Sequence, residues 1–230
     1  MTFRGQGFGS GGGPIVGVIG GSGGVGTSTF AAVLAIRAGA LLIDLDVAGG
    51  GVDVLLGIET EPGARWSGLQ VAGGRLEPDA LRAGLPHIGQ CAVLAADVAE
   101  LDADAVGQVL HAAAGSGPVV LDLPRAACVA RAAALVRCDL VVVLARADVP
   151  GLVAAHTLVA ALPDLPLGVV VRRAEIEPRR AAHSVGAPSL GVLPGLGTIG
   201  RRFDITRLPR ATARVADGVF AGLLSTPAAA

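Results

Sequence analysis

Short apolar runs alternate with segments of helical periodicity along most of this 230-residue chain. The apolar runs are rich in Val, Leu and Ile with little polar alternation, which is typical of parallel strands covered on both faces. They predict strands at residues 14–19, 40–44, 91–95, 118–122, 139–145, 167–171 and 190–193. The intervening segments predict helices at residues 27–37, 52–56, 102–114, 128–136, 150–161, 178–184 and 209–224. This order predicts an α/β fold with a single doubly wound, mostly parallel sheet and helices on both faces.

Two segments depart from this alternation. Residues 1–13 contain six glycines and little apolar content, so we expect a flexible tail or a linker stub there. Residues 59–85 are mixed in pattern, and we expect helical pieces separated by Gly and Pro. No internal repeat or boundary divides the remainder, so residues 14–230 are expected to form one domain with a sizeable core.

The composition favours a cytoplasmic protein that binds no nucleic acid and has no integral membrane segment. The net charge is −1 and only 3% of residues are aromatic, so neither a basic surface nor a platform for base stacking is expected. The five arginines from Arg201 to Arg214 are expected to form a solvated rim around the last helix. No run of about 20 apolar residues occurs. Cys91, Cys128 and Cys138 lie in apolar runs without metal-ligand spacing, so we expect them to be buried and reduced.

The segment after the first predicted strand has the spacing of a phosphate-binding loop but lacks its lysine. Residues 21–28 read Gly-Ser-Gly-Gly-Val-Gly-Thr-Ser, which matches G-x-x-x-x-G-K-[ST] except that Thr27 replaces the lysine. All 18 basic residues of the chain are arginines, so no lysine elsewhere can substitute. Backbone N–H groups and a helix N-terminus remain to hold phosphate. The loop therefore predicts nucleotide binding with little catalytic power.

Carboxylates follow two of the predicted strands. Asp44 and Asp46 come at the end of the strand at residues 40–44, and Asp122 ends the strand at residues 118–122. In open parallel sheets, ligands bind at the carboxyl ends of the strands. We therefore expect these carboxylates to lie beside the glycine loop.

Four segments together resemble the ParA/MinD family of deviant Walker ATPases. They are the glycine loop, the run Leu42-Ile43-Asp44-Leu45-Asp46, the glycine-rich segment 49–57 and the run Val120-Leu121-Asp122-Leu123-Pro124. The resemblance extends over residues 14–224. It implies a P-loop NTPase fold that binds ATP or ADP with Mg²⁺. The family's loop reads K-G-G-x-G-K-[ST], so Ser22 and Thr27 stand where the family has two lysines.

The resemblance also implies a role for each matching residue. In the family, the lysine at the position of Ser22 reaches the partner's nucleotide across a dimer interface, and the lysine at the position of Thr27 holds the β- and γ-phosphates. Ser28 matches the hydroxyl that ligates Mg²⁺, Asp46 the carboxylate that positions the attacking water, and Asp122 the aspartate near the metal. Asp46 and Asp122 are thus the expected catalytic residues. The residues expected at the nucleotide are Gly21, Ser22, Gly23, Gly24, Val25, Gly26, Thr27, Ser28, Thr29, Arg125 and Arg172.

Within the family, the run Asp122-Leu123-Pro124-Arg125 looks most like the CpaE/TadZ branch, which includes actinobacterial septum-site-determining proteins. That resemblance implies a homodimer that works with septation, pilus or secretion proteins at a pole, septum or membrane face. Members of the branch often carry a receiver-like domain before the ATPase domain, where this chain has its glycine-rich tail.

Three alternatives stay open at the level of sequence. The chain is either a nucleotide-binding regulator with a degenerate site or a slow ATPase in which Arg125 or a partner supplies the missing cation. Arg125 either clamps phosphate or pairs with a surface carboxylate. Asp46 and Asp122 either support metal-linked chemistry or are inherited with the fold. Arg172 stands where the family often has an Asn that recognises adenine, which leaves base recognition undefined.

Overall fold

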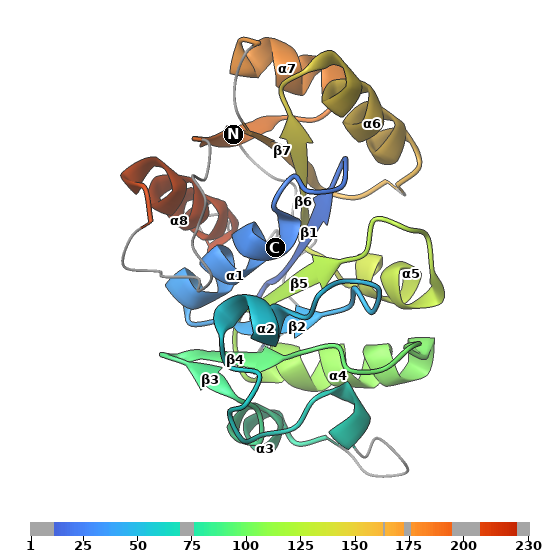
Figure 1. Ribbon diagram of the computed structural model, residues 1–230, viewed down its shortest axis with the longest axis vertical. Coiled ribbons are helices and arrows are strands. Elements are labelled where there is room, and N and C mark those ends of the chain that lie inside the picture. The colour runs from blue at the N-terminus through green and yellow to red at the C-terminus, as the bar shows by residue number, and fades with distance from the viewer. Residues whose placement is uncertain (1–11, 70–75, 163, 173–175, 195–207, 225–230) are drawn as a thin grey trace, which may run out of the picture.

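The chain folds around one sheet with helices on both sides (Figure 1). The structure is a computed structural model and describes residues 12–69, 76–162, 164–172, 176–194 and 208–224. The strands are β1 (Ile15–Gly20), β2 (Leu41–Asp44), β3 (His87–Ile88), β4 (Cys91–Leu94), β5 (Val119–Leu123), β6 (Leu140–Arg146), β7 (Leu167–Arg172) and β8 (Ser189–Leu193). The helices are α1 (Thr27–Ala38), α2 (Val52–Leu56), the 3₁₀ helix η1 (Trp66–Gly68), α3 (Pro78–Ala83), α4 (Ala103–Gly115), α5 (Val129–Leu135), α6 (Val149–Ala160), α7 (Pro178–Val185) and α8 (Arg210–Leu224).

The strand order brings distant parts of the sequence together at the centre of the sheet. The order is β3-β4-β2-β5-β1-β6-β7-β8, and every neighbouring pair except β3–β4 is parallel. β1 lies between β5 and β6, with Gly17 opposite Leu121 on one side and Val141 on the other. Because β1, β2, β5, β6 and β7 run parallel, their carboxyl ends meet at one edge. The loops that begin α1, α2, α5 and α6 all leave from that edge.

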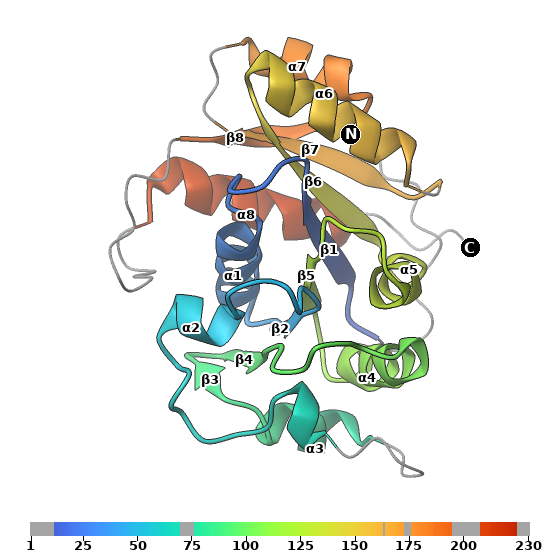
Figure 2. The same cartoon turned by 45° about the vertical axis from the view of Figure 1, so that its right-hand side comes forward.

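Two apolar layers sandwich the sheet, which explains why its strands are apolar throughout. Val16 and Val18 of β1 face the layer that contains α1, α2 and α8. Ile15 and Ile19 face the opposite layer, where α4 to α7 pack. The turned view separates α1 and α8 from α4 and α5 (Figure 2). A strand buried on both faces has no solvent side for polar residues.

Side-chain caps and glycines set the ends of several helices. The carboxylate of Asp102 accepts a hydrogen bond from the backbone N–H of Ala105 at the start of α4, and Asp148 does the same for Gly151 at the start of α6. Each cap satisfies a backbone donor that the helix itself leaves unpaired. α1 ends at Gly39, whose φ of 58° lies in the left-handed region that favours glycine. These local signals explain why the predicted boundaries fall close to the observed ones.

The fold class predicted from the sequence is confirmed, and the corrections are local. The antiparallel strand β3 was not predicted. The mixed segment 59–85 contains the helical pieces η1 and α3, as expected. Cys91 and Cys138 are buried as expected, but the expectation of burial is wrong for Cys128, which is exposed at the start of α5. Residues 1–11 of the predicted tail and residues 201–207 of the arginine-rich rim lie outside the described residues. Within the described ranges, no helix is long and apolar enough to span a bilayer.

Candidate nucleotide site

The glycine loop between β1 and α1 has a backbone shape that only glycine adopts readily. Gly24 and Gly26 have φ values of 68° and 92°, both in the left-handed region. A Cβ on Gly23 or Gly24 would meet no atom within 4 Å, so this side of the loop is open. The helix α1 starts immediately after Gly26, and its first backbone N–H groups lack intrahelical partners. Successive N–H groups at such a turn form an anion-binding nest.

Ser22 and Thr27 occupy the positions of the two family lysines, and both line the pocket in front of the loop. The hydroxyl oxygen of Ser22 is buried and has no hydrogen-bond partner in the described part of the protein. A buried polar atom without a partner costs free energy unless a ligand or water completes it. The hydroxyl of Thr27 lies over the backbone of Gly20, where an added Cβ would come within 2.4 Å of it. Neither side chain brings a positive charge.

The pocket has a volume of about 590 Å³ and gathers residues from the three loops that follow β1, β2 and β5 at the carboxyl edge of the sheet. It is lined by Gly20, Ser22, Gly23, Gly24, Gly26, Thr27, Ser28, Thr29, Asp44, Asp46, Gly49, Gly50, Gly51, Val52, Val54, Leu55, Asp122, Leu123 and Arg125. A cavity of this size suits a small-molecule ligand. Its charged groups are three aspartates and one arginine.

Two of these aspartates are buried side by side at the floor of the pocket. Asp44 and Asp122 are register partners in the β2–β5 pair. Burial raises the pKa of Asp44 to about 6, while hydrogen bonds from the backbone N–H groups of Asp46, Val52 and Ala96 oppose the rise. Burial likewise raises the pKa of Asp122 to about 7, opposed by a hydrogen bond with the Ser28 hydroxyl. Neighbouring negative charge adds to both shifts. The site therefore accumulates negative charge that a cation would relieve.

The donor set fits Mg²⁺ only together with phosphate. No cluster of three or more His, Cys, Asp or Glu residues arranged to hold a metal occurs in the described ranges. Mg²⁺ in nucleotide sites is usually held by one or two protein oxygens, substrate phosphates and water. The Ser28 hydroxyl and the Asp122 carboxylate, which are hydrogen-bonded to each other, supply such oxygens beside the loop. These residues and Asp46 would hold the ion when a nucleotide is bound.

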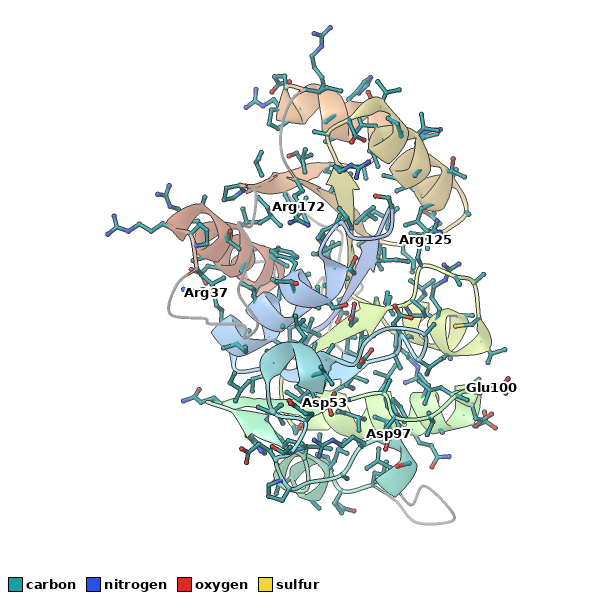
Figure 3. All side chains as sticks on the ribbon, viewed as in Figure 1. Arg37, Asp53, Asp97, Glu100, Arg125 and Arg172 are labelled. Atoms are coloured by element: carbon teal, nitrogen blue, oxygen red, sulfur yellow. The ribbon has the colours of Figure 1, made fainter. Side chains whose placement is uncertain are left out.

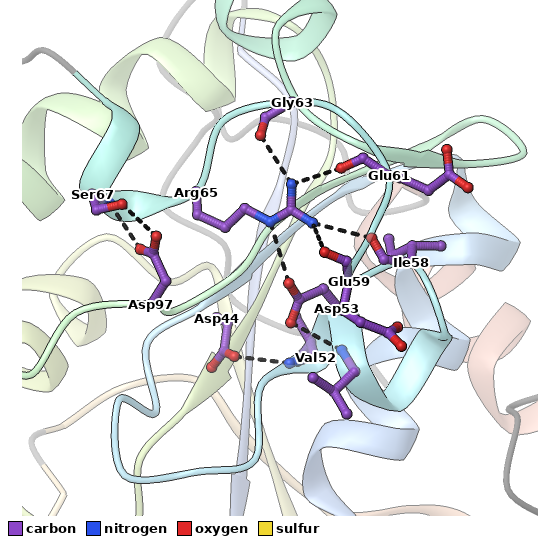
Figure 4. A network of polar contacts seen from close by, with 11 residues as sticks. Asp44, Val52, Asp53, Ile58, Glu59, Glu61, Gly63, Arg65, Ser67 and Asp97 are labelled. Carbon is purple, nitrogen blue, oxygen red and sulfur yellow. Dashed lines mark hydrogen bonds and ion pairs between the residues drawn. The ribbon is translucent and has the colours of Figure 1, made fainter.

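Residues 65–67 form a brace beside the pocket, and Figure 4 shows the polar contacts of Arg65 and Ser67. The Trp66 indole N–H donates to the carbonyl of Asp44 over 2.8 Å. The backbone N–H of Ser67 donates to Asp97 over 2.8 Å. Arg65 forms an ion pair with Asp53 of α2, with its Nε 3.2 Å from the carboxylate. The guanidinium of Arg65 also donates to the carbonyls of Ile58, Glu59, Glu61 and Gly63.

The carboxylate of Asp44 connects this brace to the pocket. Its two oxygens accept hydrogen bonds from the backbone N–H groups of Asp46, at 2.9 Å, and Val52, at 3.1 Å. These two groups flank the glycine segment at residues 49–51, which lines the pocket. Asp44 thus fixes the ends of that segment, which gives it a structural role. From the sequence, Asp44 was expected only to lie beside the glycine loop.

Arg125 and Arg172 lie at different places relative to the loop (Figure 3). Arg125 follows β5 and lines the pocket, and no ion pair between it and a carboxylate is found among the described residues. Its backbone carbonyl accepts a hydrogen bond from Arg131 over 2.5 Å. Arg172 ends β7 and does not line the pocket. Its guanidinium donates to the carbonyls of Gly24 and Val25 in the glycine loop.

Both the sequence and the fold of this chain have counterparts among known proteins. No family model matches the sequence. An uncharacterized protein found in two strains of Mycobacterium tuberculosis is 43% identical over 190 residues. The match covers 80% of this chain and 54% of the mycobacterial protein. The chain therefore spans about half the length of the curated relatives it matches.

Solved structures with the same architecture come from ATPases. A ParA family ATPase from Chlorobium tepidum superposes with a TM-score of 0.73 at 15% identity, over 90% of this chain and 97% of the other. The chain has the ParA/MinD fold. The MinD protein in a MinC:MinD cell division complex from Aquifex aeolicus gives 0.71 at 17% identity, over 90% and 96% of the two chains. The septum site-determining protein MinD from Pyrococcus horikoshii, complexed with Mg-ADP, gives 0.69 at 18% identity, over 91% and 98%.

The ParA/MinD fold brings most of the sequence-predicted site residues together. Asp46, Asp122 and Arg125 line one pocket with the loop residues 22–24 and 26–29. Gly21 and Val25 do not line it: the Gly21 N–H donates to the carbonyl of Leu144, and Val25 is buried. Gly21 and Val25 instead hold the loop against the sheet. The sequence did not single out the brace formed by Arg65 and Trp66, since no local motif marks it.

The raised pKa of Asp122 makes the free energy of unfolding of the unliganded protein depend on pH. The folded-state pKa of about 7 lies above the ordinary value of 3.8, so the folded protein binds more protons between these pH values. Its free energy of unfolding must then fall as pH rises from about 4 to about 7. We expect Asp122→Asn to remove this contribution, so that the variant gains about 2 kcal/mol relative to wild type between pH 4.5 and 7.5. Urea denaturation in EDTA measures the difference.

The exposed carboxylate of Asp104 on α4 provides the matched control. Asp104→Asn makes the same chemical change on an exposed side chain, so it should not reproduce the gain of Asp122→Asn, which arises from burial. If the free energies of Asp122→Asn and wild type stay parallel across this range, the Asp122 carboxyl is not destabilised by burial.

Proposed function

We propose that this chain is a member of the ParA/MinD superfamily and acts as a nucleotide-binding regulator with a weakened phosphate loop. It binds ATP or ADP with Mg²⁺ weakly and hydrolyses ATP at close to the background rate. The observation that carries the proposal is one pocket in which an intact glycine nest and buried aspartates surround a threonine at the lysine position. Such a site retains groups for phosphate and metal but lacks the cation that neutralises phosphate charge.

The electrostatics of phosphoryl transfer support low turnover. Catalysis of this reaction rests on positioning and on neutralising charge at the phosphoryl oxygens. Loss of one dedicated stabiliser typically lowers the rate by about 10²–10³. Ser22 and Thr27 leave two such stabilisers absent. Backbone N–H groups of the loop remain and support binding more than catalysis.

The finer assignment is to the CpaE/TadZ-like branch, with a role in septum-site determination or in placing pilus or secretion machinery. The run from Asp122 to Arg125 supports it, because it spans the end of β5 at the pocket and includes a pocket-lining arginine. We expect the protein to work in the cytoplasm and to be recruited to a pole, septum or membrane face by a septation, pilus or secretion protein. The MinD protein of the Aquifex complex is bound to MinC, which is a precedent for such a partner on this fold.

We also propose a homodimer that buries the face carrying the pocket. Val129, Val149 and Val153 are exposed by 64%, 69% and 59% of their area. They belong to the N-terminal halves of α5 and α6, which start at the same edge of the sheet as the glycine loop. Exposed apolar side chains in one region are typical of association surfaces. Because Ser22 cannot reach a partner's phosphates as lysine does, this dimer should depend little on ATP.

The alternative is a slow but genuine ATPase. One observation favours it: Arg125 lines the pocket, and no carboxylate of the described residues pairs with its guanidinium. Arginine can hold phosphate oxygens through two parallel hydrogen bonds. In this alternative Arg125 supplies the missing charge, and Asp46 orients the attacking water.

Calorimetric titration and phosphate release on the same samples separate these two functions. We expect a dissociation constant for Mg-ATP above about 1 μM, which corresponds to about −8 kcal/mol, and phosphate release within a few-fold of buffer. Sedimentation with and without ATP should give the same dimer. Asp46→Ala should leave the rate of phosphate release unchanged, because the wild-type rate is already close to background.

The opposite set of results supports the ATPase. If the wild type releases phosphate rapidly and both Asp46→Ala and Arg125→Met abolish this release, the site is catalytic and not degenerate. Submicromolar affinity would overturn weak binding, and a monomer that dimerises only with ATP would overturn the nucleotide-independent dimer.

A further inference from the structure

The end of β7 holds an arginine behind the glycine loop. Arg172 pairs in register with Arg146 of β6 and Leu193 of β8, and its carbonyl accepts a hydrogen bond from Ala147 over 3.1 Å. The strand contacts fix its backbone on both sides. Its guanidinium reaches across 148 positions of sequence to the carbonyl of Gly24, at 3.3 Å, and donates to the carbonyl of Val25 as well.

These two hydrogen bonds determine which way the loop peptides face. In a trans peptide the carbonyl and the following N–H point in opposite directions. No cis peptide occurs in the described residues. With the carbonyls of Gly24 and Val25 held by Arg172, the N–H groups of Val25 and Gly26 point away from it. Arg172 does not line the pocket, whereas Gly24 and Gly26 do.

The charge of Arg172 acts in the same direction as this geometry. A guanidinium bound to carbonyl oxygens stabilises the peptide dipoles whose positive ends face away from it. Oriented peptide dipoles of this kind form the anion-binding concavity of a phosphate loop. A permanent positive charge behind the loop also attracts an anion in front of it, and a partly buried charge is screened less than an exposed one.

We infer that Arg172 is a positioning residue for a di- or triphosphate anion, because it holds the glycine loop in its anion-binding conformation from behind. It compensates in part for the lysines that Ser22 and Thr27 replace. This assigns Arg172 to the phosphate end of the site, whereas its position in the sequence, where the family often has an adenine-recognising Asn, left base recognition undefined. The inference rests on the proposed nucleotide binding.

Affinity for inorganic pyrophosphate and ADP, measured by calorimetry, tests the inference. Arg172→Met removes the charge and both hydrogen bonds, and we expect it to weaken both ligands about ten-fold, because hydrogen bonds to charged groups are strong. Arg172→Lys keeps the charge and should restore most of the affinity. The matched control is Arg146→Met, which removes the register neighbour that pairs with Asp148 and should leave both affinities unchanged.

Backbone ¹⁵N relaxation of the loop amides in the unliganded protein gives a second readout. Arg172→Met should increase the fast motion of residues 23–27, and Arg146→Met should not. If Arg172→Met does not fold, Arg172→Gln replaces it, since it keeps a donor but not the charge. Pyrophosphate affinity and loop motion that are the same in wild type and in the uncharged variant, Arg172→Met or Arg172→Gln, overturn the inference. Failure of the wild type to bind any phosphate ligand overturns the proposed function instead, and relaxation alone then decides whether Arg172 positions the loop.

Discussion

Thr27→Lys is expected to bind Mg-ATP about 10- to 100-fold more tightly than wild type. The substitution places an ammonium at the position where Thr27 now lies over Gly20 on the pocket floor. A hydrogen bond to a charged group contributes about 1.5–3 kcal/mol, and each 1.4 kcal/mol is a factor of ten in affinity. The glycine nest is already formed, so little reorganisation opposes the gain. Isothermal titration measures the change directly.

The control for Thr27→Lys is Thr27→Met, which has a side chain of similar length without charge. Thr27→Met should bind ATP no better than wild type. If the Lys and Met variants bind equally, side-chain bulk rather than charge limits the wild-type affinity. Salt should weaken binding to the Lys variant more than to wild type, because screening reduces charge interactions.

The same variant reports whether the aspartates keep a catalytic arrangement. Thr27→Lys should raise phosphate release only if Asp46 and Asp122 still hold water and metal in place. Adding Asp46→Ala to Thr27→Lys should then return release to background. If Thr27→Lys binds ATP tightly but does not hydrolyse it, the aspartates were inherited with the fold and have no catalytic role.

Arg65→Ala is expected to lower the free energy of unfolding by about 2–4 kcal/mol. The side chains of Arg65 and Asp53 are only 14% and 13% exposed, and the guanidinium serves four carbonyls besides the carboxylate. Removing it leaves Asp53 and these carbonyls without their partner in a partly buried place, and such losses cost far more than exposed pairs. Chemical denaturation monitored through Trp66 measures the effect.

Arg37→Ala is the matched control for Arg65→Ala. Arg37 likewise forms an ion pair, with its Nη2 2.8 Å from the carboxylate of Asp217 in α8, but both side chains are exposed. The expected loss is below about 1 kcal/mol. If Arg65→Ala costs no more than Arg37→Ala, the brace is not a significant source of stability. A weaker ATP affinity in folded Arg65→Ala would show that the brace also shapes the pocket wall.

The fold was predictable because its signals are local. Strands buried on both faces require uninterrupted apolar runs, so the run at residues 139–145 predicted β6 to within one residue at each end. The helices predicted to start at residues 102 and 150 are α4 and α6, whose observed starts, capped by Asp102 and Asp148, lie within one residue of the prediction. By contrast, β3 has only two residues and pairs antiparallel at the edge of the sheet. So short a strand leaves no periodic pattern.

The sequence by itself determined the identity of the pocket groups: a glycine loop without lysine, and aspartates at the ends of β2 and β5. Strand parallelism then required these groups to meet at one edge. Only the tertiary structure decided what supports them. Arg172 contacts the loop from 148 positions away, and the Trp66 indole reaches the carbonyl of Asp44 across 22 positions. Such contacts depend on which strands and loops become neighbours and on side-chain direction, which no local pattern of residues encodes.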